Sequence, residues 1–287
     1  MEPSSSLRTS AVDALLPVEI ARKAELIGAQ KARLDAVSLI VLSVLAGAFI
    51  ALGAMFATTV VAGTEGMLPF GIRRLLAGVV FALGLVLVVL AGAELFTGNA
   101  LMVMALAARR ISLAEMLRAW SIVYVGNLLG ALGTAMLVFL SGQYLAGDGA
   151  VAAAAVSLAA EKSALPFDRA FFLGVLCNVL VCLAVWLSIG ARTTTDKILA
   201  VMLPVSAFVA AGFEHSVANM YLVPLGLLIA DWAPLELWAR IPAAVADAAG
   251  LSWAKFVYSL LPVTLGNAVG GGALVGGVYW LAYLRKR

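Results

Sequence analysis

Long stretches without a charged side chain are the feature that most constrains this chain of 287 residues. These runs cover residues 36–62, 75–93, 100–108, 119–147, 170–191, 198–213, 215–230 and 256–284. Hydrophobic residues make up 63% of the chain and charged residues 12%, whereas a soluble domain is about half apolar and about a quarter charged. The sequence therefore predicts an all-α membrane protein.

The lengths of the runs predict how many times the chain crosses the bilayer. A helix needs about 20 residues to cross roughly 30 Å of hydrocarbon; four runs are long enough and 75–93 is nearly so. Runs 198–213 and 215–230 are too short alone and meet at Glu214–His215, so we interpret them as two parts of one interrupted helix. Runs 75–93 and 100–108 flank the segment ELFTGN in the same way. We therefore expect six transmembrane helices, with the second and fifth broken.

The distribution of basic residues predicts the orientation. Thirteen Lys and Arg lie on the side of both termini and six on the other, which places both termini in the cytoplasm of a multi-pass protein. Residues 1–35 lack the apolar core of a secretory signal and form the N-terminal segment, in which Pro17 can begin an amphipathic helix on the cytoplasmic face. The six-span transmembrane domain covers 36–284, and 285–287 form a basic C-terminus.

An internal repeat relates the two halves. GAELFTGNALMV, which begins at Gly92, aligns with GFEHSVANMYLV, which begins at Gly212, and GNLLG in the third span matches GNAVG in the sixth. Each copy holds three spans, approximately 36–147 and 170–284, so the second copy must insert upside down. Inverted repeats with broken helices are how many transporters build a site near the midplane.

The segments GAELFTGN, NVLVCLAVWLS, GFEHSVANM and PVTLGNAVGGG resemble, in order, the signatures of the formate/nitrite transporter family. The resemblance implies an aquaporin-like fold, assembly as a homopentamer with one pore in each protomer, and a place in a bacterial inner membrane. It also implies a small monovalent anion of a weak acid as the substrate: formate, nitrite or hydrosulfide, often with protons. We expect formate first, although Glu94 and the Gly-Asn after Thr97 fit nitrite-type members equally well.

The resemblance also assigns residues. It implies a proton relay of His215 with Thr97 facing it, from the opposite broken helix. The substrate pathway would include Lys162 at the outer mouth, Asn178 and Asn267. The constriction would be formed by Phe81, Leu85, Leu95, Phe96, Val181 and Phe208. Alternatively, Lys162 is an ordinary solvated charge in a loop, and Asn178 and Asn267 only hold helices together.

Physical arguments support these assignments. A formate ion that enters an apolar slit loses hydration, and histidine can supply a proton because its charge changes near physiological pH. Unsatisfied backbone groups at membrane depth cost several kcal/mol each, and we expect Glu94 and Glu214 to be structural caps that satisfy the amides freed by the two breaks.

Other classes of function fit the sequence less well. An enzyme needs a nucleophile–base pair or metal ligands, and one histidine without a ligand motif predicts no enzyme, no metal and no cofactor. The orientation rule explains the basic composition without a nucleic-acid partner, and membrane lipid and protons are the other expected partners. An aquaporin-like channel for neutral solutes remains the main rival, although the paired NPA motifs are absent.

Overall fold

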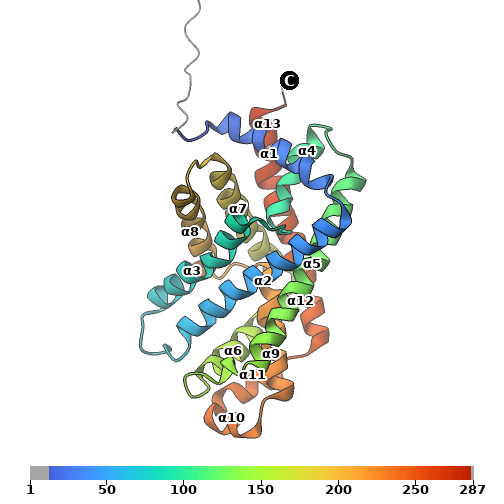
Figure 1. The fold of residues 1–287 in the computed structure, drawn as a ribbon. Coiled ribbons are helices and arrows are strands. Elements are labelled where there is room, and N and C mark those ends of the chain that lie inside the picture. Colours follow the sequence, from blue (N-terminus) through green and yellow to red (C-terminus); the bar gives the residue numbers. More distant parts are fainter. Residues whose placement is uncertain (1–12, 286–287) are drawn as a thin grey trace, which may run out of the picture.

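The computed structural model describes residues 13–285, and the expected features in residues 1–12 and 286–287 lie outside them. The described residues form an elongated bundle of helices (Figure 1). Three crossings are continuous: α2 (Ala36–Val61), α5 (Leu113–Leu140) and α7 (Phe167–Gly190). The predicted all-α membrane fold is confirmed, because six helical segments in the described chain are long and apolar enough to span a bilayer.

The second and fifth crossings are interrupted, as the short runs predicted. The second consists of α3 (Phe70–Leu87), the π-helical turn η1 (Val88–Gly92), the 3-10 turn η2 (Gly98–Met102) and α4 (Val103–Ala107). The fifth consists of α8 (Thr194–Ala211) and α9 (Ser216–Trp232), and the sixth of α12 (Trp253–Ala268), the π-helical η5 (Val269–Gly277) and α13 (Val278–Tyr283). The remaining elements are α1 (Pro17–Ala32), η3 (Gln143–Leu145), α6 (Ala150–Ser163), α10 (Leu235–Arg240), η4 (Pro242–Ala244) and α11 (Val245–Ala249).

Helix ends differ from the charge-free runs for local reasons. Helix α5 begins six residues before the run 119–147, because the Ser112 hydroxyl accepts from the amide of Glu115 and the Glu115 carboxylate accepts from the amide of Ser112. This reciprocal cap stabilises the start of the helix, so the helix can begin within a charged segment that the charge-free run left out. The helix ends at Leu140, shortly before Gly142 takes a left-handed conformation with φ of 73°.

The N-terminal helix lies on the bundle itself. Helix α1 begins at Pro17, as predicted, and lies beside α4 and α13 at one end of the molecule (Figure 1). It buries Ile20, Ala24 and Gly28, and it contacts α4, η2 and α7. The apolar face of this helix therefore packs against the chain's own helices.

Helix α6 was missed from the sequence, and the expectation that Lys162 lies in a loop is wrong. The helix is alanine-rich and only 14 residues long, too short to be counted as a span. It packs against α9 near the end of the molecule opposite to α1 (Figure 1). Lys162 lies in its last turn, so the lysine is held by a packed helix.

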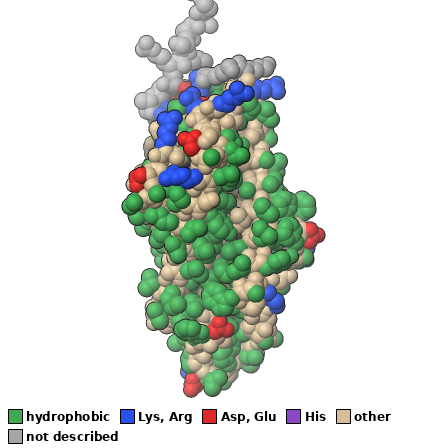
Figure 2. Space-filling view, turned by 90° about the vertical axis from the view of Figure 1, so that its right-hand side faces the viewer, with side chains coloured by type: hydrophobic (Ala, Val, Ile, Leu, Met, Phe, Trp, Pro, Cys, Tyr) green, Lys and Arg blue, Asp and Glu red, His purple; other side chains and the backbone are tan. Residues whose placement is uncertain are grey.

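The surface agrees with a membrane location. Figure 2 shows hydrophobic side chains over most of the visible face, with Lys and Arg gathered near one end. Large exposed apolar side chains occur along several spans, including Leu137 and Leu140 of α5 and Leu203 of α8. Such a surface suits lipid or another apolar neighbour.

Glycines allow the closest helix contacts. A Cβ atom at Gly130 of α5 would overlap the carbonyl oxygen of Val44 in α2, and one at Gly270 in the sixth crossing would overlap that of Val175 in α7. Both glycines end the repeated GNxxG motif. The motif thus brings α2 against α5, and α7 against the sixth crossing, at matching points.

We predict that Gly130→Ala and Gly270→Ala each lower the thermal unfolding midpoint of the detergent-solubilised protein, because the added methyl meets backbone that cannot move alone. The expected loss is about 1–3 kcal/mol, as for overpacking elsewhere. Gly133→Ala is the matched control, since nothing lies within 4 Å of a Cβ atom there. Equal midpoints for Gly130→Ala and Gly133→Ala would contradict this account of the packing.

Candidate functional site

Two interruptions in the helices form the centre of the site. The first covers Ala93–Thr97, between η1 and η2, and the second covers Gly212–His215, between α8 and α9. Each begins at a glycine with positive φ, 80° at Gly92 and 75° at Gly212. Glycine adopts this conformation without steric cost, which explains why the repeated segments both start with this residue.

Buried asparagines hold both interruptions. Asn127 of α5 accepts from the amide of Phe96 at 2.9 Å and donates to the carbonyls of Ser43 and Glu94 at 2.8 and 2.9 Å. These side-chain hydrogen bonds link the first break to α2. Because a side-chain amide offers both a donor group and an acceptor, one residue satisfies three buried backbone groups.

Asn267 of α12 does the same for the second break. It accepts from the amide of Ser216 at 2.9 Å and donates to the carbonyls of Gly174 and Glu214 at 2.8 and 2.9 Å. Both asparagines are 0% exposed. Sequence reasoning assigned Asn267 to the substrate pathway and did not single out Asn127, although the repeated GN dipeptide carried the signal.

The carboxylates of Glu94 and Glu214 have partners other than those expected. Glu94 accepts from Lys31 of α1 at 2.8 Å and from Asn99 at 2.8 Å. Glu214 accepts from Lys162 at 2.8 Å and from Asn219 at 2.7 Å. The prediction that these carboxylates cap loop amides is therefore wrong, because the asparagine pair takes that role and each carboxylate forms an ion pair.

The two networks contain the same residue types. A lysine, a glutamate and an asparagine form one polar cluster at each break. They differ in one bond: Lys31 also donates to Asn99 Oδ1, whereas Asn219 Oδ1 has no partner among the described residues. The backbone contacts are also alike, since the amides of Glu94 and Glu214 donate to Leu42 and Leu173. These matches support the internal repeat, while the inverted orientation of its copies remains a prediction.

His215 and Thr97 meet between the two breaks. The His215 Nε2 atom lies 3.0 Å from the Thr97 hydroxyl, and Nδ1 lies 3.0 Å from the amide nitrogen of Ala218. A backbone amide can only donate, so Nδ1 is the acceptor and a neutral ring carries its hydrogen on Nε2. His215 therefore begins helix α9 as its N-cap and presents an N–H to Thr97, with both side chains buried.

Two cavities approach this pair. The first, of about 530 Å³, is named here the Lys162 cavity; besides Lys162, it is lined by Arg74, Phe81, Phe208 and His215 among others. The second, of about 550 Å³, is named the Lys31 cavity and is lined by Lys31, Leu85, Glu94 and Leu95 among others. They share no lining residue. The two cavities are therefore separate, and buried side chains such as Ile50 and Val217 lie in the core of the bundle.

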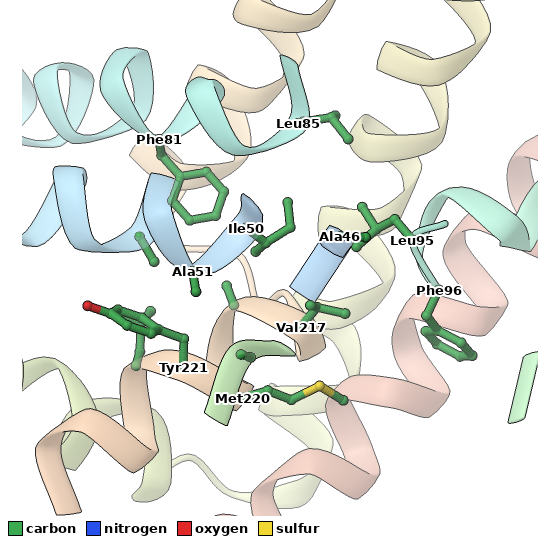
Figure 3. Close-up of a cluster of buried hydrophobic side chains, with 14 of the residues drawn as sticks. Ala46, Ile50, Ala51, Phe81, Leu85, Leu95, Phe96, Val217, Met220 and Tyr221 are labelled. Atoms are coloured by element: carbon green, nitrogen blue, oxygen red, sulfur yellow. The ribbon is translucent and has the colours of Figure 1, made fainter. Parts of the chain in front are cut away.

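Aromatic rings form the barrier on the Lys162 side. Phe81 and Phe208 meet edge to face with ring centroids 5.7 Å apart, and Phe208 stacks on the His215 ring at 5.9 Å. Figure 3 shows Phe81, Leu85 and Leu95 around the buried core of α2. Leu85 and Leu95 are 2% exposed and border the Lys31 cavity.

Three residues predicted to lie along the pathway do not line either of these two cavities. Phe96 is directed away from the other labelled side chains (Figure 3) and packs on Trp120 and Tyr124 of α5. Val181 is 1% exposed, and neither it nor Phe96 lines a cavity. Asn178 is 0% exposed and donates to the carbonyls of Thr97 and Asn267. Their roles in the pathway stay predictions.

The arrangement defines a class of protein: a membrane protein with two broken helices that meet at a buried polar pair, between two cavities separated by apolar side chains. Residues 18–281 match the formate/nitrite transporter family. The chain therefore belongs to this family, and the resemblance noted in the sequence is confirmed. The family consists of transporters rather than enzymes.

Individual relatives agree. The chain is 42% identical over 275 residues to "Formate channel FocA" of Escherichia coli strain K12, with 96% of each chain covered. It is 37% identical over 286 residues to "Probable formate transporter" of Methanothermobacter thermautotrophicus, covering 94% of this chain and 97% of the relative. Among solved structures, "Pentameric formate channel with formate bound" is similar at a TM-score of 0.82 and 42% identity, covering 87% of this chain and 98% of that one.

We predict that Asn127→Ala and Asn267→Ala each destabilise the protein by at least about 1–3 kcal/mol, because each leaves buried backbone groups without partners. The measurement is thermal unfolding of the purified protein. Asn127→Asp and Asn267→Asp are the matched variants: they keep the acceptor for the loop amide but set an oxygen against the two carbonyls that the amide nitrogen bound, so each should also be destabilised. Wild-type stability of both alanine variants would contradict the bridging role.

Proposed function

We propose that the chain is a channel for a small weak-acid monoanion, with formate as the first candidate, that works as a homopentamer in a bacterial inner membrane. The observation that carries this proposal is the buried contact between His215 and Thr97. His215 lines the Lys162 cavity, and the Lys31 cavity is lined by Leu95 and Gly98 on either side of Thr97 in the chain. The chain's similarity to a formate channel over 96% of its length supports formate. Nitrite and hydrosulfide are the alternatives within the same family.

Charge explains how an anion could approach. Three cations and one carboxylate line the Lys31 cavity: Lys23, Lys31, Lys197 and Glu94. Cations beside a low-dielectric wall raise the local concentration of anions there. The Lys162 cavity is of mixed charge, lined by Lys162, Arg73, Arg74, Glu65, Glu161, Glu214 and Asp247. The orientation predicted from the basic-residue count would put the Lys162 cavity on the outer face and the Lys31 cavity on the cytoplasmic face.

Desolvation explains why a proton is needed. Between the cavities an anion meets Phe81, Phe208 and Leu85, which offer no hydrogen bonds, so the neutral acid passes at a lower cost. Apolar constrictions also exclude hydrated ions by dewetting. A small carboxylic acid such as formic acid fits this requirement because one proton removes its charge.

His215 is the proposed proton carrier. The neutral ring can accept a proton only at Nδ1, and taking one there breaks the hydrogen bond from the Ala218 amide. The proton comes from solvent in the Lys162 cavity, which His215 lines. The imidazolium then donates the Nε2 proton to the anion, which leaves as the neutral acid, and the ring is left neutral with its hydrogen on Nδ1. Uptake of a proton at Nε2 and loss of the one at Nδ1 to solvent restore the first tautomer and the bond from Ala218. Positive charge at Lys162 and at the start of α9 disfavours the imidazolium. An anion that arrives beside the ring offsets this positive charge and so favours protonation of His215.

We predict that His215→Asn keeps the fold and loses the pH-dependent part of formate uptake. Asparagine is a good N-cap, so it can still accept from the Ala218 amide, but it cannot titrate. The measurement is formate and nitrite flux into proteoliposomes between about pH 5 and pH 8, around the titration of an ordinary histidine. Thr97→Ala is the companion variant and should weaken transport less.

Identical pH profiles for wild type and His215→Asn would contradict the proton relay and leave His215 as a packing residue. Formate uptake by wild type would still support the channel in that case. An aquaporin-like function would instead give glycerol uptake that does not respond to pH or to anions.

A further inference from the structure

Arg74 is one of the six basic residues that the sequence analysis counted on the side opposite the termini. It lies in the second turn of α3, and its guanidinium reaches across to the end of α8. Its Nε atom donates to the carbonyl of Ala210 at 3.1 Å and its Nη2 atom to that of Val209 at 2.9 Å. Two donors of one planar group thus bind two successive carbonyls of a helix terminus.

The end of α8 offers carbonyls that such a group can bind. The last carbonyls of a helix have no partner within the helix, and here the chain turns away at Gly212, whose φ is 75°. The amide of Gly212 donates to the Val209 carbonyl at 3.1 Å and that of Phe213 to the Phe208 carbonyl at 3.0 Å. Arg74 therefore adds a second donor to Val209 and binds Ala210, which ties this terminus to α3.

The last turns of α8 also carry Phe208, an aromatic residue of the predicted constriction. Phe208 meets the Phe81 ring edge to face and stacks on His215. Arg74, Gly78 and Phe81 recur at the spacing of one face of α3, and a Cβ atom at Gly78 would lie 2.6 Å from the carbonyl oxygen of Ser206. The face of α3 that brings Phe81 to Phe208 is therefore the face that carries Arg74.

The other interruption has no equivalent contact. A Cβ atom at Gly92 would meet nothing within 4 Å, whereas one at Gly212 would lie 2.7 Å from the Arg74 Nη2 atom. A left-handed glycine after a helix thus does not by itself require an arginine. The contact belongs to the side of the pathway where the two phenylalanines meet.

We propose that Arg74 is a positioning residue for selectivity: by binding the carbonyls of Val209 and Ala210, it fixes the last turns of α8 against α3 and so sets the contact between Phe81 and Phe208. The inference rests on the proposed function, since it concerns which anions pass. Arg74 acts through Phe208 and need not touch the anion.

The neighbouring arginine provides a matched control. Arg73 lines the same cavity and carries the same charge, but its ion pair is with the exposed Glu65 at 3.5 Å, and it donates no hydrogen bond to α8 among the described residues. Arg73→Gln and Arg74→Gln therefore remove the same charge from the same cavity, and only the second releases the helix end.

The test compares lactate with formate flux into proteoliposomes. Both are monovalent anions, so a loss of attracting charge changes their local concentrations alike and cancels in the ratio. We expect Arg74→Gln to raise the lactate-to-formate ratio by up to about tenfold, the scale of one lost charge-assisted hydrogen bond, and Arg73→Gln to leave it unchanged. Phe208→Ala, which removes the ring itself, should raise the ratio at least as much.

Arg74→Lys should give a ratio between those of wild type and Arg74→Gln, because an ammonium group lacks the planar fork that fits two carbonyls. If Arg74→Gln does not fold, the comparison is made between Arg74→Lys and Arg73→Lys. Equal ratios for the two members of a matched pair would overturn the positioning role. A wild-type protein that takes up no formate would instead overturn the proposed function, so the two failures are distinguishable.

Discussion

The structure depends on one constraint: backbone groups freed by a helix break inside a membrane must find partners within the protein. Asn127 and Asn267 meet this constraint, each by accepting from one loop amide and donating to two carbonyls. The glycines of the same motifs allow the helices to approach closely enough for these bonds. With the loops held in this way, Thr97 and His215 can meet at the centre of the bundle without an uncompensated backbone around them.

The charged side chains around the two breaks are paired in the same way. Each glutamate is neutralised by a lysine and bound by an asparagine, so neither carboxylate is left as an unpaired buried charge. A buried ion pair adds little stability, but these pairs link the breaks to elements outside the pore: Lys31 lies in α1 and Lys162 in α6. The same residues therefore hold the loops and border the two cavities.

Much of the fold followed from the sequence because lipid imposes simple rules. Charge-free runs located the six crossings, and their lengths located the two breaks, since a run of sixteen residues cannot span the bilayer. Helix α6 was not predicted because a short alanine-rich helix lacks the length of a membrane span. The partners of Glu94 and Glu214 were not predicted for another reason: Lys31 and Lys162 are far from them in sequence, and only packing brings them together. The role of Arg74 depends on its direction across to α8, which no spacing within one helix reveals.

The central claim is that the two breaks form a pathway for a weak-acid anion rather than for a neutral solute. Stopped-flow measurement of formate and glycerol uptake into proteoliposomes of the wild-type protein tests it most directly. The account predicts formate uptake that increases as the outside is acidified, together with glycerol uptake no faster than in liposomes without protein. Glycerol uptake as fast as that of formate, and independent of pH, would contradict it.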